Sequence, residues 1–281
     1  MTKKQRKRTH WLLAVSAVLL AALLFAPSAL AFEDDPDGYL PEGETINDDL
    51  VISYGEVTID GTVHGDVMAS GNTITVNGTI DGNLLLNCDS ATLNGTVGGS
   101  VAFIGQRLTL NSSVDGTIYF AGAELVLGEE ALVKHNILFL GFNLKSFPGS
   151  VVQQDIRATG AQMQLGGTIK QNLDADLDAI EIDGIIEGNA EVDIQAPSLR
   201  AADPIWLNIW WRVANHNITA PEPIPSGMRI GPEAQINGEL RYESPVEQAK
   251  AIQSTPGEGT TFIPAPLDVK PGQAGQRAGL M

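Results

Sequence analysis

Cysteine and histidine are scarce in this chain of 281 residues. Cys88 is the only cysteine, so neither an internal disulfide nor a thiolate metal cluster can form. The four histidines, His10, His64, His135 and His216, are dispersed, and we expect His64 and His135 to lie in solvated turns. We therefore predict no catalytic residues, no metal site and no cofactor, and expect that the protein is not an enzyme.

Basic residues are also few. The chain has 17 Lys and Arg against 34 Asp and Glu, a net charge of −17. Five of the basic residues lie in the first eight positions, and the chain without them has 12 against 34, a net charge of −22. So acidic a surface repels the phosphates of nucleic acids and anionic lipids. Nucleic acid is therefore excluded as a partner.

A long hydrophobic run occurs only near the N-terminus. Residues 1–31 combine a basic start, an apolar run from Trp11 to Phe25 and small residues at Ala29–Ala31, which is typical of a cleaved secretory signal. Alternatively, this stretch stays as an N-terminal membrane anchor, since ~20 apolar residues span a bilayer. Both readings place the rest of the chain outside the cytoplasm, at the extracellular face of the membrane, the cell surface or the periplasm. Residues 32–48 are acidic and contain Pro and Gly, so we predict a disordered leader.

An eight-residue motif recurs every 17 residues after this leader. Its first four copies are Asp60–Val67, Asn77–Leu84, Asn94–Val101 and Asn111–Ile118. Looser copies follow at 130–137, 149–156, 166–173 and 183–190, and a ninth at 233–240. A repeat this short is one structural unit that buries its apolar face only by stacking on its neighbours.

Each copy carries apolar residues at its fourth and eighth positions, and most copies carry glycine at the second and sixth. Glycines there disfavour a helix by about 1 kcal/mol each relative to Ala. The flanking runs alternate polar with β-branched or other apolar residues, as half-buried strands do. Three short strands per 17 residues predict an all-β, single-stranded parallel β-helix, or β-solenoid, with triangular coils about 4.8 Å apart. The predicted core ladder comprises Val63, Val67, Ile80, Leu84, Val97, Val101, Val114 and Ile118.

The repeats divide the chain into segments. We predict eight coils in residues 49–199, an insertion at 200–229, a returning ninth coil at 230–243 and a disordered Pro/Gly-rich tail at 244–281. Three of the four tryptophans, Trp206, Trp210 and Trp211, lie in the insertion. The insertion is either a cap over the open end of the solenoid or a patch for a membrane interface or a cell-envelope partner.

Two other features bear on function. Thr62, Thr79 and Thr96 occupy the same position in successive repeats, which favours a ligand-, ice- or glycan-binding face as an alternative. Enzymes of the β-helix class that cleave polysaccharides need Asp clustered with Arg or Lys on one face. We expect no such cluster to align between successive repeats.

The Gly-Thr-Val-x-Gly-Asp-Val motif and the 17-residue coil resemble those of the bactofilins, a family of polymer-forming cytoskeletal proteins. The resemblance covers roughly residues 49–194 and, more weakly, 230–242. It implies a right-handed β-helix that polymerises end to end without nucleotide into membrane-associated filaments or sheets that scaffold other proteins, with no catalytic residues. Typical members are cytoplasmic, whereas this chain carries an export signal. The expectation is a non-enzymatic scaffold that binds itself; the alternative is a monomeric extracellular ligand- or glycan-binding module.

Replacing Val97 by Asp tests the inward assignment of the ladder. A carboxylate buried between coils without a partner should destabilise the fold by about 3–5 kcal/mol. Thermal unfolding followed by circular dichroism measures this, and a variant that melts like the parent protein would refute the assignment.

Overall fold

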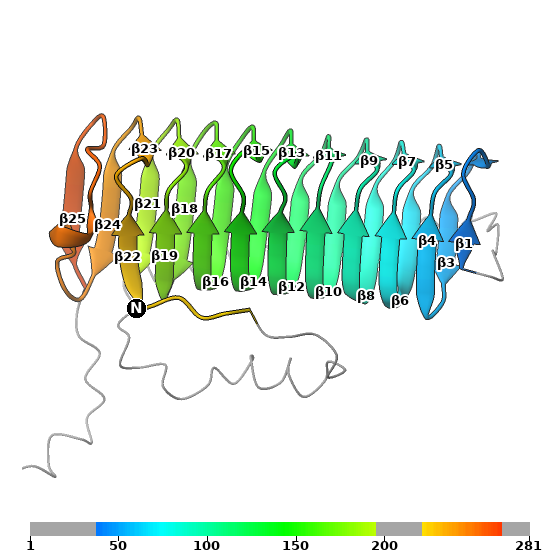
Figure 1. Ribbon diagram of the computed structural model, residues 1–281, viewed down its shortest axis with the longest axis horizontal. Coiled ribbons are helices and arrows are strands. Elements are labelled where there is room, and N and C mark those ends of the chain that lie inside the picture. Colours follow the sequence, from blue (N-terminus) through cyan, green and yellow to red (C-terminus); the bar gives the residue numbers. More distant parts are fainter. Residues whose placement is uncertain (1–37, 195–220, 266–281) are drawn as a thin grey trace, which may run out of the picture.

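The computed structural model describes residues 38–194 and 221–265. Its parallel strands stack into a β-solenoid of about 12 turns, seen as a long rod in Figure 1. The predicted fold class is therefore confirmed.

Two sheets run along the rod. The first contains two-residue strands, one per coil: β2 (Thr45–Ile46), β5 (Thr62–Val63), β7 (Thr79–Ile80), β9 (Thr96–Val97), β11 (Ser113–Val114), β13 (Leu132–Val133), β15 (Val151–Val152), β17 (Thr168–Ile169), β20 (Ile185–Ile186) and β23 (Gln235–Ile236). The nine predicted repeats each contribute one of these strands, and β2 is the tenth.

The second sheet contains longer strands. Its middle coils use ten-residue strands: β6 (Val67–Val76), β8 (Leu84–Leu93), β10 (Val101–Leu110), β12 (Ile118–Leu127), β14 (Ile137–Ser146) and β16 (Ile156–Leu165). Shorter strands complete it at the two ends: β1 (Tyr39–Leu40), β3 (Leu50–Ser53), β4 (Glu56–Ile59), β18 (Leu173–Leu177), β19 (Ala179–Ile182), β21 (Ala190–Ile194), β22 (Gly227–Ile230), β24 (Leu240–Ser244) and β25 (Thr260–Pro264). A short 3₁₀ helix, η2 (Ala249–Ala251), precedes β25.

Each ten-residue strand forms two sides of a coil. In β6 the inward residues are Val67 and Ala69, then Ile74 and Val76. The step from Ala69 to Ile74 is five residues, an odd number, and so breaks the two-residue alternation. The strand therefore bends there, and both of its halves face the core. The prediction of three separate short strands is corrected: two of them are continuous in these coils, and they separate where β3 and β4, β18 and β19, or β21 and β22 divide.

Identical positions stack from coil to coil. Every strand pair is parallel, with Val63 beside Ile80 and Val97 beside Val114. The eight predicted ladder residues are each no more than 1% exposed. Phe103, Phe120 and Phe139 continue this order inside the core, with successive rings stacked 5.2 Å apart.

Glycine at the bend makes room for the phenylalanine stack. Gly105, Gly122 and Gly141 each follow a stacked phenylalanine by two residues and align in register. A Cβ atom added at Gly122 would lie 2.4 Å from the carbonyl oxygen of Gly105 and 2.9 Å from the Phe120 ring. The close approach of neighbouring backbones therefore leaves no room for a Cβ atom at Gly122, although Cys88 occupies the equivalent position in β8.

The solenoid begins earlier than predicted. Strands β1 and β2 lie within residues 32–48, so the prediction of disorder there is wrong for the part from Tyr39 to Ile46. Residues 43–50 are a tenth copy of the motif, 17 residues before Asp60–Val67, with Asp48 where several copies have glycine. The acidic composition of residues 32–48, with Pro and Gly, favoured a disordered leader and so hid this copy.

The solenoid also ends later than predicted. Strand β25 pairs with β24, and the Gly257 amide donates to the Ile236 carbonyl at 2.8 Å, so residues 245–265 form a further coil. The prediction of a disordered tail is therefore wrong for this part. The ninth coil likewise begins with β22 at Gly227 rather than at residue 230. Because Ala190 pairs with Leu240, 50 residues separate positions that are usually 17 apart, and the extra chain leaves after Ile194.

Replacing Gly122 by Ala should destabilise the solenoid by about 1–3 kcal/mol, because the methyl group meets a backbone carbonyl that has nowhere to move. Gly55→Ala is the matched control, since its Cβ would have no atom within 4 Å. Chemical denaturation of both variants measures the difference; equal midpoints would contradict this account of the bend.

Candidate interaction surfaces

A polar ladder holds the coils together at the turn after the second glycine of the motif. The Asp66 carboxylate accepts from the Asn83 amide at 2.7 Å, and the Asn83 side chain accepts from the Ser100 amide at 2.9 Å. The same contact recurs between Asp155 and the Asn172 amide at 3.0 Å. These small polar side chains therefore satisfy turn amides that the strands leave unpaired.

A second polar ladder, which sequence reasoning missed, flanks the two-residue strands. Asp60 accepts from the Asn77 side chain at 2.7 Å, and Asn94 and Asn111 continue the series at 2.8 and 2.9 Å.

Outward threonines lie on both sides of this ladder. One series is the predicted Thr62, Thr79 and Thr96, extended at its start by Thr45. The other is Thr58, Thr75, Thr92 and Thr109, and the Thr-x-Asn-Gly-Thr pattern could have revealed it.

Charged residues align on one face near the C-terminal end of the rod, contrary to expectation. Arg157, Asp174, Glu191 and Arg241 occupy one row, and the neighbouring row contains Asp176 and Asp193. Although Asp174 is exposed by its surface area, partial desolvation of its carboxyl by neighbouring side chains, and then the Glu191 charge, raises the pKa of Asp174 above its usual range. The expectation that no acidic and basic cluster aligns between repeats is therefore wrong. Arg157, Asp174 and Glu191 follow one another at steps of 17, so the repeat could have revealed their alignment; the 50-residue step before Leu240 hides only the register of Arg241.

The histidine and cysteine side chains lie in two different environments. Nδ1 of His64 lies 2.5 Å from Oδ2 of Asp81 in the next coil, at an exposed turn, and His135 is also exposed. Cys88 is buried, and burial raises the pKa of its thiol to about 12. Within residues 38–194 and 221–265, no group of three or more His, Cys, Asp or Glu side chains could hold a metal ion.

The N-terminal end of the rod has an open backbone edge. Among the described residues, β2 pairs only with β5 and β3 only with β6. The amides of Leu50 and Tyr54 donate to the coil of β6, so strand alternation points the N–H and C=O groups of Val51 and Ser53 away from it. Leu50 and Ile52 are buried, while Tyr54 is 55% exposed.

The C-terminal end has a matching edge with a more polar interior. The Gly259 carbonyl accepts from Leu240, and the Ala265 amide donates to Ser244, so the backbone groups of Thr260 and Phe262 point away from β24. Phe262 packs on Tyr242 at a ring distance of 5.1 Å. Thr260, by contrast, occupies a row that is apolar in the other coils.

Several predicted features lie outside the described residues. These are the signal or anchor at 1–31, His10, His216 and the tryptophan patch of Trp206, Trp210 and Trp211. In the part of the chain that is described, no helix is long and apolar enough to cross a bilayer.

Comparison of the chain with family models, with curated proteins and with solved structures found no match in any of the three.

The raised pKa of Cys88 predicts that iodoacetamide leaves the native protein unmodified at pH 8, because the reactive thiolate is rare and buried. Unfolding in urea should return the pKa to its ordinary range and permit complete alkylation. Mass spectrometry of the two samples measures this. Stoichiometric alkylation of the native protein would show that the thiol is accessible.

Proposed function

We propose that this protein is a non-enzymatic scaffold whose solenoid self-associates end to end without nucleotide, at the outer side of a membrane or on the cell surface. The observation that carries the proposal is a pair of strand edges, β3 at one end and β25 at the other, whose outer sides have no partner strand within residues 38–194 and 221–265; both strands belong to one sheet and run in the same direction. Open edges of this kind are templates for pairing with another chain.

The free backbone groups of the two edges are complementary. If β3 of one copy follows β25 of another in the parallel register used throughout the rod, Leu50 lies beside Thr260 and Ile52 beside Phe262. The outward backbone N–H and C=O groups of Thr260 and Phe262 then alternate with those of Val51 and Ser53, as they do in the hydrogen-bond ladder of two parallel strands. A head-to-tail contact of this kind repeats without closing, and so generates a filament.

The resemblance to the bactofilins supports the same proposal, since it implies end-to-end polymers that act as scaffolds. The N-terminal segment 1–31 supports export, because its basic start and apolar run are those of a signal or an anchor. Export, membrane association and the bactofilin relationship remain parts of this proposal.

A second candidate is a monomeric extracellular module that binds a glycan or another ligand. It is favoured by the two threonine series beside the asparagine ladder, which present hydroxyl and amide groups at the coil spacing. This candidate requires binding without assembly.

Electron microscopy of the chain from Phe32 to Met281 without nucleotide tests the scaffold proposal, which predicts filaments. In the proposed register Val51 faces Thr261 across the junction, on the outer surface of the rod. Changing both to Lys should therefore abolish filaments by like-charge repulsion, while V51E with T261K should restore them.

Unchanged melting temperatures serve as the control for both double variants. Monomers of the parent protein under all conditions would overturn the scaffold proposal in favour of the binding module. Filaments that persist in V51K/T261K would reject the head-to-tail register.

A further inference from the structure

One outer face of the rod carries apolar side chains where solvent-facing strand residues are usually polar. Met68, Leu85, Ala102, Tyr119 and Leu138 align in one row across β6 to β14 and point outward, opposite in phase to the core ladder. Ile104 and Leu140, both half-buried, and the buried Ala121 between them form the adjoining row. We name these eight residues the outward apolar patch.

The patch ends abruptly along the rod. In the next coils the first row continues as Arg157, Asp174 and Glu191, all exposed. Five coils at 4.8 Å make the patch about 19 Å long, and its two rows lie about 7 Å apart. Such a strip is far smaller than the roughly 800 Å² per partner of a stable interface between separate proteins. A covalently tethered segment, present at a high effective concentration, needs much less area.

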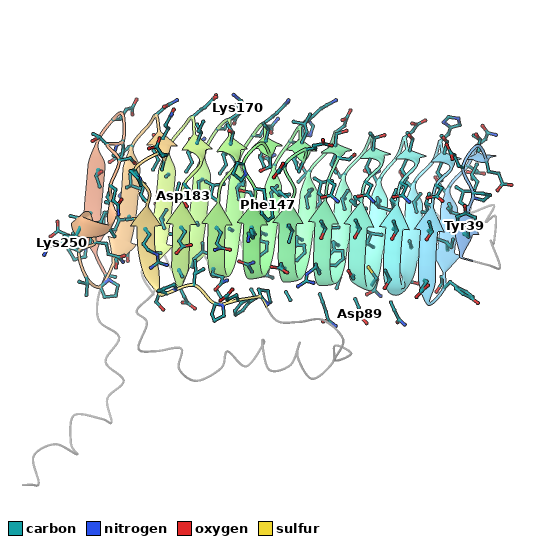
Figure 2. All side chains as sticks on the ribbon, in the orientation of Figure 1. Tyr39, Asp89, Phe147, Lys170, Asp183 and Lys250 are labelled. Atoms are coloured by element: carbon teal, nitrogen blue, oxygen red, sulfur yellow. The ribbon has the colours of Figure 1, made fainter. Side chains whose placement is uncertain are left out.

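A tether leads toward the patch from one long edge of the rod. Residues 221–226, which we name the strap, run along the edge where the ten-residue strands bend, beneath β16 in Figure 1 and on the same side as Asp89 in Figure 2. The side-chain amide of Gln162, 3% exposed, holds the strap by two bonds. It donates to the Glu222 carbonyl at 2.8 Å and accepts from the Ile224 amide at 3.0 Å.

The direction of the strap is set by these contacts. Gly227 pairs with Ala179, which is itself the partner of Gln162 one coil earlier. Traced backward from Gly227, the strap therefore passes two coils toward the N-terminal end, in the direction of β14 and β12. Gln162 is followed in the same direction by Asn143 and Glu124, so Pro221 approaches the bend that borders the patch.

The chain between Ile194 and Pro221 is long enough and apolar enough to cover the patch. Its 26 residues could extend over about 86 Å, against about 19 Å from the coil of β16 to that of β8. Residues 205–213 carry three tryptophans together with Ile205, Leu207, Ile209 and Val213. The C-terminal end of the rod, which a cap would cover, is instead occupied by the coil of residues 245–265.

We propose that residues 205–213 dock on the outward apolar patch of the same chain through their tryptophan, leucine and isoleucine side chains. This contact buries apolar surface on both partners and leaves the two ends of the rod unobstructed. It does not depend on end-to-end assembly.

Tryptophan fluorescence of the full chain carrying W11F tests the proposal, because the remaining tryptophans are all in residues 206–211. Docked rings should emit at shorter wavelength than in urea and resist acrylamide quenching. L85K and L138K should each shift the emission to longer wavelength and raise the quenching constant about twofold, since a charge in the patch releases the rings to solvent. T92K is the matched control, because Thr92 lies on the other outward face of the same coil as Leu85. It should change neither the emission wavelength nor the quenching constant.

Two results would overturn the proposal. One is acrylamide quenching of the parent chain that is as strong as in urea and falls only when vesicles of phosphatidylcholine and phosphatidylglycerol are added. That result would indicate that the tryptophans bind a membrane rather than the patch. The other is identical fluorescence of L85K, L138K and T92K.

A cross-linking measurement keeps the test valid if the lysine variants fold poorly. A short bismaleimide should join the cysteines of L138C/W210C within one chain, because Cys88 is buried and the two sites lie together in the docked state. T92C/W210C should remain unlinked. Equal cross-linking of both pairs, or none in either, would also overturn the proposal.

Discussion

The structure depends on one constraint: every coil must present the same inward side chains, in the same register, to the coil on each side. A single 17-residue coil encloses too little apolar surface to fold alone, so its stability comes from the neighbours on which it stacks. The core ladder, the phenylalanine stack and the polar turns all meet this constraint at the 4.8 Å spacing. A side chain that does not fit, such as a methyl group at Gly122, therefore collides with the adjacent coil as well as with its own.

The same constraint explains how much could be predicted. The apolar positions Val63 and Val67 and their equivalents recur with fixed spacing, because the core admits little variation, and they were enough to give the fold class and nine coils. The first coil escaped because the acidic composition of residues 32–48, with Pro and Gly, predicted disorder, although Thr45 and Ile46 form a strand there. The last coil escaped because Thr260 stands at a position that is apolar elsewhere, so a pattern of buried residues carried no signal there.

Surface features were predicted less well, since they arise from register rather than from local sequence. Arg157, Asp174 and Glu191 align at the regular step of 17 residues, whereas the alignment of Tyr119 with Leu138 needs a coil of 19 residues. The contact of Gln162 with the strap joins residues 60 and 62 positions apart, a separation that no repeat encodes. The rod therefore has two kinds of surface. Its ends present backbone N–H and C=O groups that point away from the neighbouring described strand, and its sides change from apolar to charged along the axis.

End-to-end association of the rods is tested most directly by backbone hydrogen exchange resolved by residue. The amides of Val51, Ser53, Thr260 and Phe262 point outward from the terminal strands, so the account predicts that they exchange rapidly in dilute protein and become protected together as the concentration rises. The core amides of β10 and β12 provide the internal reference, because their exchange should not depend on concentration. Exchange at the four edge amides that is the same at every concentration would contradict the account.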